Sequence, residues 1–491
     1  MSAHIKSNRI SRDTIIYIPV FLAPAIINII LLMIFTRFFS PKEYGTYTIV
    51  VNTTIILSSV LAQWIVLSVQ RFRPEYSHNG TIREFNRNLN RLLLFISMGF
   101  LAAAVIFYPF LPSGLVSYRD YYWSSVLLII STIYFTVLGG VYQVDLQSKQ
   151  FRNLNVIQSI MKLVIILIFV MAIYYSPVSF IWGTLAAQAL VTIPMLRYAE
   201  TGKMFRSMKA AKDSFFGFGK KFWRYGFPLI GWYIGTTVMN LTDRFMIEYF
   251  RSSHEVGIYS ANFTIAVQAI ALICNPLFFA IQPIMMNEIQ QHSEQEHIER
   301  RISNFTHLFI IIAMPFGVYF SIYRHEISEL LLGNQFTSGA IIIPILIIGF
   351  FAWNIGLYGQ LAYQIAKRTK EMFYFVFIAA LTNFTLNLYF IPKWGFIGAA
   401  ISTTIGFFVY SGLLAAFAHR FIKWKIPWMA FSKVFLLVLV VGFPFFLAKA
   451  LYQVNVSPLL KMISGLPFFL IYAGAVFILW KNAIREIISS S

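Results

Sequence analysis

Apolar runs of about 20 residues recur from one end of the chain to the other, and short polar connectors separate them. A helix of about 20 apolar residues crosses roughly 30 Å of hydrocarbon, so each run predicts a transmembrane helix. The pattern therefore predicts an all-α polytopic membrane protein with about fourteen spans. The predicted spans are Ile15–Phe38, Thr46–Gln70, Asn90–Leu111, Tyr121–Val144, Val156–Tyr175, Val178–Leu196, Phe222–Ile247, Val256–Met286, Ile302–Tyr323, Thr337–Ala366, Met372–Ile391, Phe396–His419, Trp428–Leu451 and Pro458–Trp480.

The composition agrees with this prediction. Of the 491 residues, 58% are hydrophobic and 12% are charged, whereas soluble domains average about 25% charged residues. The single cysteine, Cys274, lies inside an apolar run, which excludes a disulfide framework or a cysteine-rich metal site. The eight histidines show no paired spacing of metal ligands. We therefore expect neither a metal nor another cofactor.

The distribution of positive charge predicts the topology. A net charge of +20 would suit a nucleic-acid partner, but the basic residues lie in short connectors rather than on one domain. Of the 39 lysines and arginines, 28 fall on the side of the N-terminus, 9 on the opposite side and 2, Lys162 and Lys433, within spans. Cytoplasmic loops carry the excess of Lys and Arg, so both termini are predicted to be cytoplasmic and no nucleic-acid partner is expected.

The chain also repeats a short motif. The pattern E-x-G-x-Y occurs at residues 43–47 after the first span and at residues 255–259 after the seventh. Six spans separate the copies, so both halves have the same orientation, as in a parallel repeat around a central site. The predicted organisation is an N-lobe (1–200), a basic cytoplasmic connector (201–221), a C-lobe (222–420), and two extra spans with a cytoplasmic tail (421–491).

Several stretches resemble a known family of transporters. The segment from Arg37 to Tyr47 (RFFSPKEYGTY), the stretch Tyr225–Pro228 leading to Asp243-Arg244, Val256–Ser260, and Asn387–Gly395 with Gly398–Ala400 are similar to Wzx-type polysaccharide flippases. These belong to the multidrug/oligosaccharidyl-lipid/polysaccharide exporter (MOP) superfamily. The resemblance implies a two-lobed, MATE-like fold. It also implies that O-antigen or capsule repeat units, carried on undecaprenyl diphosphate, are flipped to the outer leaflet of the bacterial inner membrane during polysaccharide and lipopolysaccharide biosynthesis.

The implied partners are this lipid-linked glycan, the surrounding membrane lipid, and the polymerase and glycosyltransferases of the same pathway. A diphosphate cannot cross hydrocarbon as an isolated charge without a cost of tens of kcal/mol, so we expect a polar cavity with cations. Lys162, about a turn and a half into the fifth span, either lines this cavity or snorkels to the cytoplasmic interface. Arg71 and Arg73 end the second span, where they either meet the incoming diphosphate or reflect ordinary topology.

A second group of candidates lies at span ends and inside spans. Asp243 and Arg244 close the seventh span, where they either form an ion pair that gates the outer side or satisfy each other at a helix end. Arg37, at the repeat-related end of the first span, has the same alternatives and is also a cavity candidate. Three intramembrane amides either contact sugar hydroxyls or bond to neighbouring helices, namely Asn240, Gln282 and Asn383.

Two other functions compete with this interpretation. An ion-coupled multidrug exporter would carry a buried Asp or Glu, and no conspicuous acidic residue falls in the middle of a predicted span. A membrane-bound polysaccharide polymerase or ligase would need a sizeable external loop, but the external connectors are short. Nucleotide-binding and metal motifs are also missing from the sequence, so we do not expect an enzyme.

Overall fold

The computed structural model describes residues 22–111, 117–199, 215–290, 295–366, 368–418, 420–422, 424, 426–451 and 457–489. Within these ranges the chain is helical, without strands. Eleven of the described helices are long and apolar enough to cross a membrane. The protein is therefore a multi-pass membrane protein, as the apolar runs predict.

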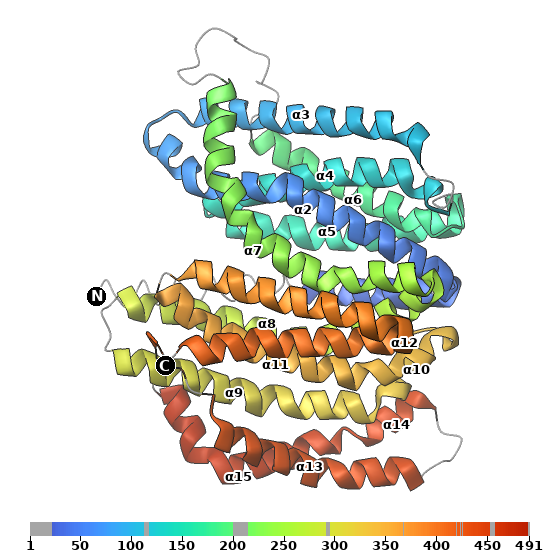
Figure 1. Ribbon diagram of the computed structural model, residues 1–491, viewed down its shortest axis with the longest axis vertical. Coiled ribbons are helices and arrows are strands. Elements are labelled where there is room, and N and C mark those ends of the chain that lie inside the picture. The colour runs from blue at the N-terminus through green and yellow to red at the C-terminus, as the bar shows by residue number, and fades with distance from the viewer. Residues whose placement is uncertain are drawn as a thin grey trace. The chain divides into compact units, whose positions relative to one another are not determined.

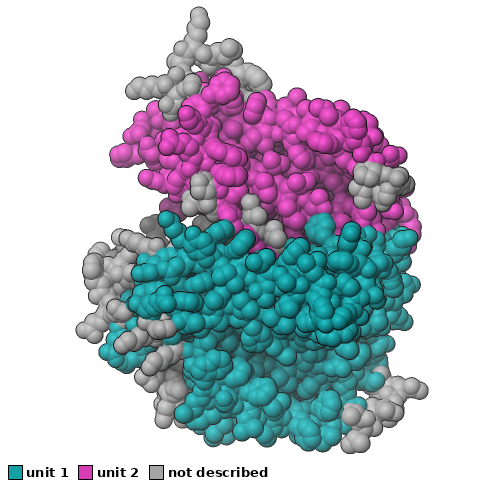
Figure 2. Space-filling view, in the orientation of Figure 1, with its two compact units in different colours: residues 1–14, 32–45, 242–491 teal, residues 15–31, 46–241 magenta. Residues whose placement is uncertain are grey.

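The chain forms two compact units, coloured separately in Figure 2. Unit 1 contains Leu32–Gly45 and the chain from Thr242 onward, and unit 2 contains Thr46–Leu241 together with described residues 22–31. The chain passes from one unit to the other inside three helices, which are Leu22–Phe38, α2 (Pro41–His78) and α7 (Phe215–Phe250).

Unit 2 is a bundle of long helices that run roughly side by side in Figure 1. α4 packs against both α5 and α6, and α5 packs along α6. The core between α2, α3, α4 and α7 is aromatic and aliphatic, with the rings of Phe85, Phe218 and Phe222 fully buried. Between α2 and α7, unit 2 contains α3 (Ile82–Phe107), α4 (Arg119–Val144), α5 (Ser148–Ile168), a π-helical turn (Phe169–Ile173) and α6 (Val178–Tyr198).

Unit 1 is built around α11, which packs against α8, α9 and α12. An ion pair ties the last helices to this core, because Lys449 Nζ on α13 lies 2.7 Å from Glu326 Oε2 on α10. The elements are α8 (Ser253–Gln290), α9 (Gln295–Ile322), α10 (Arg324–Leu331), a 3₁₀ segment (Asn334–Ile341), α11 (Ile342–Ile365), α12 (Thr369–Ala418), α13 (Trp428–Leu451), α14 (Pro458–Ser464) and α15 (Pro467–Ser489).

The helices follow the fourteen predicted spans closely. α12 holds two of them, because its backbone breaks at Gly395 (φ 55°, ψ −136°), a left-handed conformation that glycine adopts without a steric penalty. The first and seventh predicted spans correspond to the shorter helix Leu22–Phe38 and to α7. Several helices are longer than the predicted spans, since α3, α7 and α9 each begin seven or eight residues earlier. α2 continues to His78, so the prediction that Arg71 and Arg73 end this span was wrong, and both lie within a helix.

The glycines of the two copies of the repeated motif meet inside unit 1. Gly45 is the fifth residue of α2, and Gly257 is the fifth residue of α8. A Cβ atom on Gly45 would collide with the carbonyl oxygen of Ser253, and one on Gly257 would collide with that of Pro41. The backbones of the two helices therefore touch where they cross. Such an approach needs residues without a side chain.

Candidate functional site

The fifth span carries polar side chains along one face. Four of them recur at the spacing i, i+3, i+4 and i+7, which places them on one side of α5: Asn155, Gln158, Ser159 and Lys162. We call this set the polar stripe. Successive residues of an α-helix are rotated by about 100°, so the residues on the side of α5 opposite the polar stripe can be identified. They are apolar, and each is between 46% and 50% exposed: Ile157, Ile160, Val164 and Ile168. The exposed apolar side suits lipid, so the polar stripe faces protein or water.

Lys162 is the charged member of the polar stripe. Its Nζ donates to Asn28 Oδ1 on the helix Leu22–Phe38 at 3.2 Å. Asn28 is a neutral amide, and within the described ranges Lys162 forms no ion pair. A cation inside a membrane span is costly unless water or an anion meets it. The arrangement can therefore receive an anionic group at the ammonium of Lys162.

Arg73 is held by a cluster of side chains within unit 2. Its Nε and Nη2 both donate to the carboxylate of Asp145 at 2.7 Å, and its Nη1 donates to Asn86 Oδ1 at 2.6 Å. The hydroxyl of Tyr198 donates to Asp145 Oδ2 at 2.8 Å, and the guanidinium lies over the ring of Phe85. The side chain of Arg73 is only 4% exposed. These contacts fit a structural anchor between helices better than a receptor for an incoming phosphate.

We expect Arg73→Ala to destabilise the protein by about 3–5 kcal/mol, because the substitution leaves the partly buried carboxylate of Asp145 without its cation. The matched control is Arg71→Ala, on the same helix but exposed, which should cost less than about 0.5 kcal/mol. Thermal unfolding of the purified variants measures both. Replacing the pair together, as Arg73→Met with Asp145→Leu, should recover part of the loss, and equal losses for the two arginines would contradict the assignment.

Arg71 stays exposed in a basic and aromatic neighbourhood. Its guanidinium lies 6.0 Å from the ring centre of Phe72, and Lys221 Nζ lies 4.4 Å from the same ring. Lys221 also lies 3.8 Å from Glu75 on α2. Arg71 and Arg73 are thus neighbours in sequence with different surroundings, and of these two only Arg71 remains accessible to a phosphate.

Unit 1 contains a buried carboxylate. Asp243, on α7, is fully buried and accepts hydrogen bonds from Tyr259 OH at 2.7 Å, from Asn387 Nδ2 at 2.8 Å and from Thr403 Oγ1. The amide of Asn383 accepts from Asn387 Nδ2 at 3.2 Å and donates to Thr403 Oγ1. We call these five residues the Asp243 cluster. It joins α7, α8 and both halves of α12.

The chemistry of this cluster suits a small ligand with positive charge. It offers carboxylate, amide and hydroxyl oxygens, which are donors that hard cations prefer. Asn387 Oδ1 is buried and lacks a hydrogen-bond partner, and a buried polar atom of this kind calls for an explanation. The cluster can hold a proton or a small cation. Among the residues described, no group of three or more His, Cys, Asp or Glu side chains could form a conventional metal site.

Of the other candidates, Arg244 lies against the Asp243 cluster through Tyr259, and the rest are dispersed. Arg244 is buried, with its guanidinium 4.1 Å from the ring centre of Phe263 and 5.3 Å from that of Tyr259. Asn240 Nδ2 donates to the carbonyl of Thr236 one turn earlier at 2.8 Å. Arg37 is exposed, and its Nη2 donates to the carbonyl of Leu330 at 3.1 Å. The side chain of Gln282 lies outside the described residues.

The structure brings in residues that sequence reasoning missed. Asn28 meets Lys162 from another helix, and Asp145 binds Arg73 across 72 positions of sequence. Asn387 and Thr403 reach Asp243 from more than 140 positions away. A signal existed for Asn387, because with Asn383 it forms an i, i+4 pair of amides inside an apolar run. For the other partners, no comparable pattern stands in the sequence.

Comparisons with known proteins agree with this architecture. The family model described as "Polysaccharide biosynthesis protein" matches residues 10–290, which is more than half of the chain. "Uncharacterized membrane protein MJ1068" of Methanocaldococcus jannaschii is 24% identical over 59% of this chain and 57% of its own length. "Probable low-salt glycan biosynthesis flippase Agl15" of Haloferax volcanii is 24% identical over 52% of each chain. The matched region thus spans about half the length of these curated relatives.

Solved structures share the fold over nearly the whole chain. The lipid II flippase MurJ, in an inward closed conformation, superimposes with a TM-score of 0.77 at 15% identity, over 96% of this chain and all of that one. An inward-facing multidrug resistance MATE family transporter of the MOP superfamily gives a TM-score of 0.63 at 12% identity, over 85% of this chain and 94% of that one. The predicted all-α, MATE-like fold is confirmed.

Proposed function

The chain belongs to the polysaccharide biosynthesis protein family, and we propose that it is a flippase for lipid-linked oligosaccharides. In its specific form, the proposal is that undecaprenyl-diphosphate-linked repeat units of O-antigen or capsule pass from the cytoplasmic to the outer leaflet of the bacterial inner membrane. Both termini are then cytoplasmic, and the polymerase and glycosyltransferases of the pathway are its functional partners. The chain acts as a transporter, not as an enzyme.

The observation that carries the proposal is the polar stripe of α5. It places the ammonium of Lys162 beside a neutral amide, on the side of the helix opposite the exposed apolar residues. A diphosphate with about two negative charges would compensate this ammonium, and phosphates are regular ligands of lysine. The amides and hydroxyl of the same stripe suit the sugar. A long apolar tail needs no such surface and stays in the bilayer.

The membrane potential is one driving force that would favour transport of the diphosphate in the outward direction. With the cytoplasm negative, outward movement of two negative charges gains about 2.3 kcal/mol per charge per 100 mV. Roughly 4–5 kcal/mol at 100 mV would favour export if the diphosphate moves with its charge uncompensated. Abolishing the potential while ion gradients are kept should then slow flipping, and an unchanged rate would exclude this contribution.

The test of the proposed function is the fate of the lipid intermediate. In cells depleted of the protein, we expect undecaprenyl-diphosphate oligosaccharide to accumulate in the cytoplasmic leaflet, because synthesis continues while export stops. Lipid extraction with mass spectrometry identifies the intermediate, and its accessibility to an added membrane-impermeant reagent reports the leaflet. Re-expression of the wild-type chain should clear the accumulation. Normal polymer at the surface with no trapped intermediate would overturn the proposal.

A second candidate function is an ion-coupled multidrug exporter. It is favoured by one specific observation, the buried carboxylate of Asp243, which the sequence had placed at a helix end. The family match extends to the end of α8 and favours a glycan substrate. The two observations are compatible if binding of a proton or a cation at the Asp243 cluster drives glycan export.

We expect Asp243→Asn to abolish transport if such coupling operates, because the amide cannot take up a proton or balance a cation at neutral pH. The variant keeps the size of the side chain, so the hydrogen bond from Tyr259 can persist. The measurement compares flipping in vesicles with and without imposed ion and proton gradients. A variant that transports at the wild-type rate and still responds to the gradients would exclude coupling through this carboxylate.

A further inference from the structure

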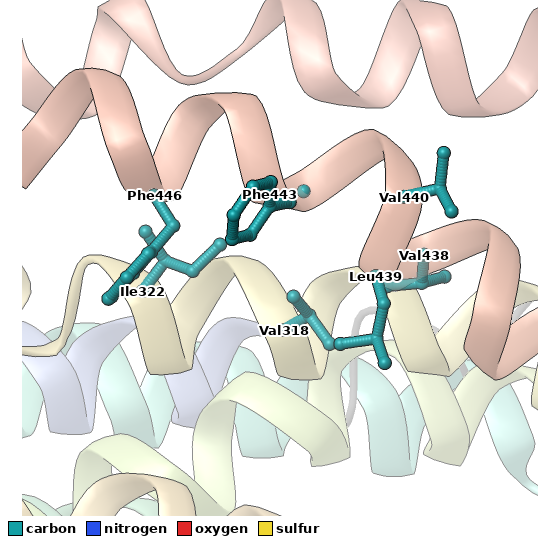
Figure 3. Close-up of a pocket in the computed structure, with 8 residues that line it drawn as sticks. Val318, Ile322, Val438, Leu439, Val440, Phe443 and Phe446 are labelled. Carbon is teal, nitrogen blue, oxygen red and sulfur yellow. The ribbon is translucent and has the colours of Figure 1, made fainter.

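Among the described residues of unit 1, two of the cavities have opposite character. One, of about 600 Å³, is apolar and lies between α9 and α13, where Figure 3 shows Leu439, Phe443 and Phe446 near Val318 and Ile322. The other, of about 490 Å³, is polar and lies where the helix Leu22–Phe38 ends beside the segment 329–335. We call it the polar pocket. Cavities of this size accept small ligands.

The polar pocket has a fixed frame. Arg37 donates to the carbonyl of Leu330, and a Cβ atom on Gly333 would collide with the carbonyl of Thr36, so the two segments touch through their backbones. Leu332, which also lines the pocket, and Phe336 in the same segment are buried. A pocket that is already formed spares a ligand the cost of ordering it.

The lining combines both charges with neutral hydrogen-bonding groups. Arg37 and Glu329 supply one positive and one negative side chain, and Asn334 and Gln335 supply amides. All four are exposed. Phe38 adds a ring that is 42% exposed. The pocket thus presents donors, acceptors and an aromatic surface with no net charge from its lining side chains.

This combination selects among ligands. A diphosphate would bring its negative charges next to Glu329, which disfavours it. A sugar carries hydroxyl groups that both donate and accept, matching amides, carboxylate and guanidinium together. Aromatic rings supply flat apolar area for its C–H face. We propose that the polar pocket is a carbohydrate subsite, which holds a sugar residue of the transported glycan on the side of the membrane opposite the N-terminal tail.

This inference rests on the proposed function, and a binding experiment tests it separately. The probe is the lipid-free oligosaccharide released by mild acid from the lipid-linked fraction of the source cells. Saturation-transfer NMR with the full chain in lipid nanodiscs should show binding. Asn334→Ala with Gln335→Ala should weaken it about tenfold, as expected for the loss of two hydrogen bonds. Ser338→Ala, exposed in the same segment outside the pocket lining, is the matched control and should bind normally.

The outcomes separate the two proposals. Absence of binding by the wild-type chain, or equal binding by the double variant and the control, would overturn the carbohydrate subsite. Displacement of the sugar by inorganic pyrophosphate would also overturn it, since the pocket would then be an anion site. In either case the proposed function stands if depleted cells still accumulate the lipid intermediate, and it fails on that experiment alone.

Discussion

Replacing Lys162 with alanine is expected to lower the rate of glycan export about tenfold or more while leaving the protein folded. The ammonium is the one charge on the polar stripe, and its described contact is a single hydrogen bond of 3.2 Å to Asn28. Charge-assisted hydrogen bonds contribute about 1.5–3 kcal/mol, which corresponds to roughly 10- to 150-fold in rate or affinity. Initial rates of flipping in reconstituted vesicles, with thermal unfolding of the same preparation, measure the two effects.

Lys433 provides a matched control for Lys162. It is the other lysine inside a predicted span, but it is exposed near the start of α13, where its side chain can reach the interface. Lys433→Ala should therefore export normally, and Lys162→Arg should retain most of the activity because it keeps the positive charge. Full activity of Lys162→Ala would remove this residue from the pathway, while the family assignment would stand.

The sequence predicted the helices well because their signal is local. Apolar runs of the length of a bilayer locate each span without reference to the rest of the chain. The break inside α12 was also predictable, since Pro392 and Gly395 interrupt two apolar runs and Gly395 adopts positive φ. The end of α2 was misplaced because polar residues after Gln70 suggested solvent, whereas Arg73 is buried against Asp145 and the helix continues.

The candidate site was predicted only in part, because its partners are assembled by the fold. Lys162 stood out as a charge in an apolar run, but its partner Asn28 lies 134 positions away on another helix. Asp243 and its neighbour Arg244 both contact Tyr259, but the other partners of the carboxylate, Asn387 and Thr403, come from α12.

Gly257→Ala is expected to destabilise the protein by at least about 1–3 kcal/mol, the usual cost of overpacking, and to reduce export with it. The added methyl group would strike the carbonyl of Pro41, which is backbone and cannot rotate away. Gly412→Ala is the matched control, because it too lies inside a helix but has nothing within 4 Å of its added carbon. That control should be neutral or slightly stabilising, since alanine favours helices by up to about 1 kcal/mol over glycine.

The double variant tests whether the two repeated motifs form one contact. Gly45 and Gly257 occupy the same crossing, so a shift that admits the first methyl group also makes room for the second. The losses from Gly45→Ala and Gly257→Ala should then be clearly less than additive, whereas independent sites add within about 0.3–0.5 kcal/mol. Thermal unfolding of the three variants measures the coupling. Additive losses would mean that each glycine is needed for its own local reason, and that the repeat of E-x-G-x-Y does not reflect their meeting.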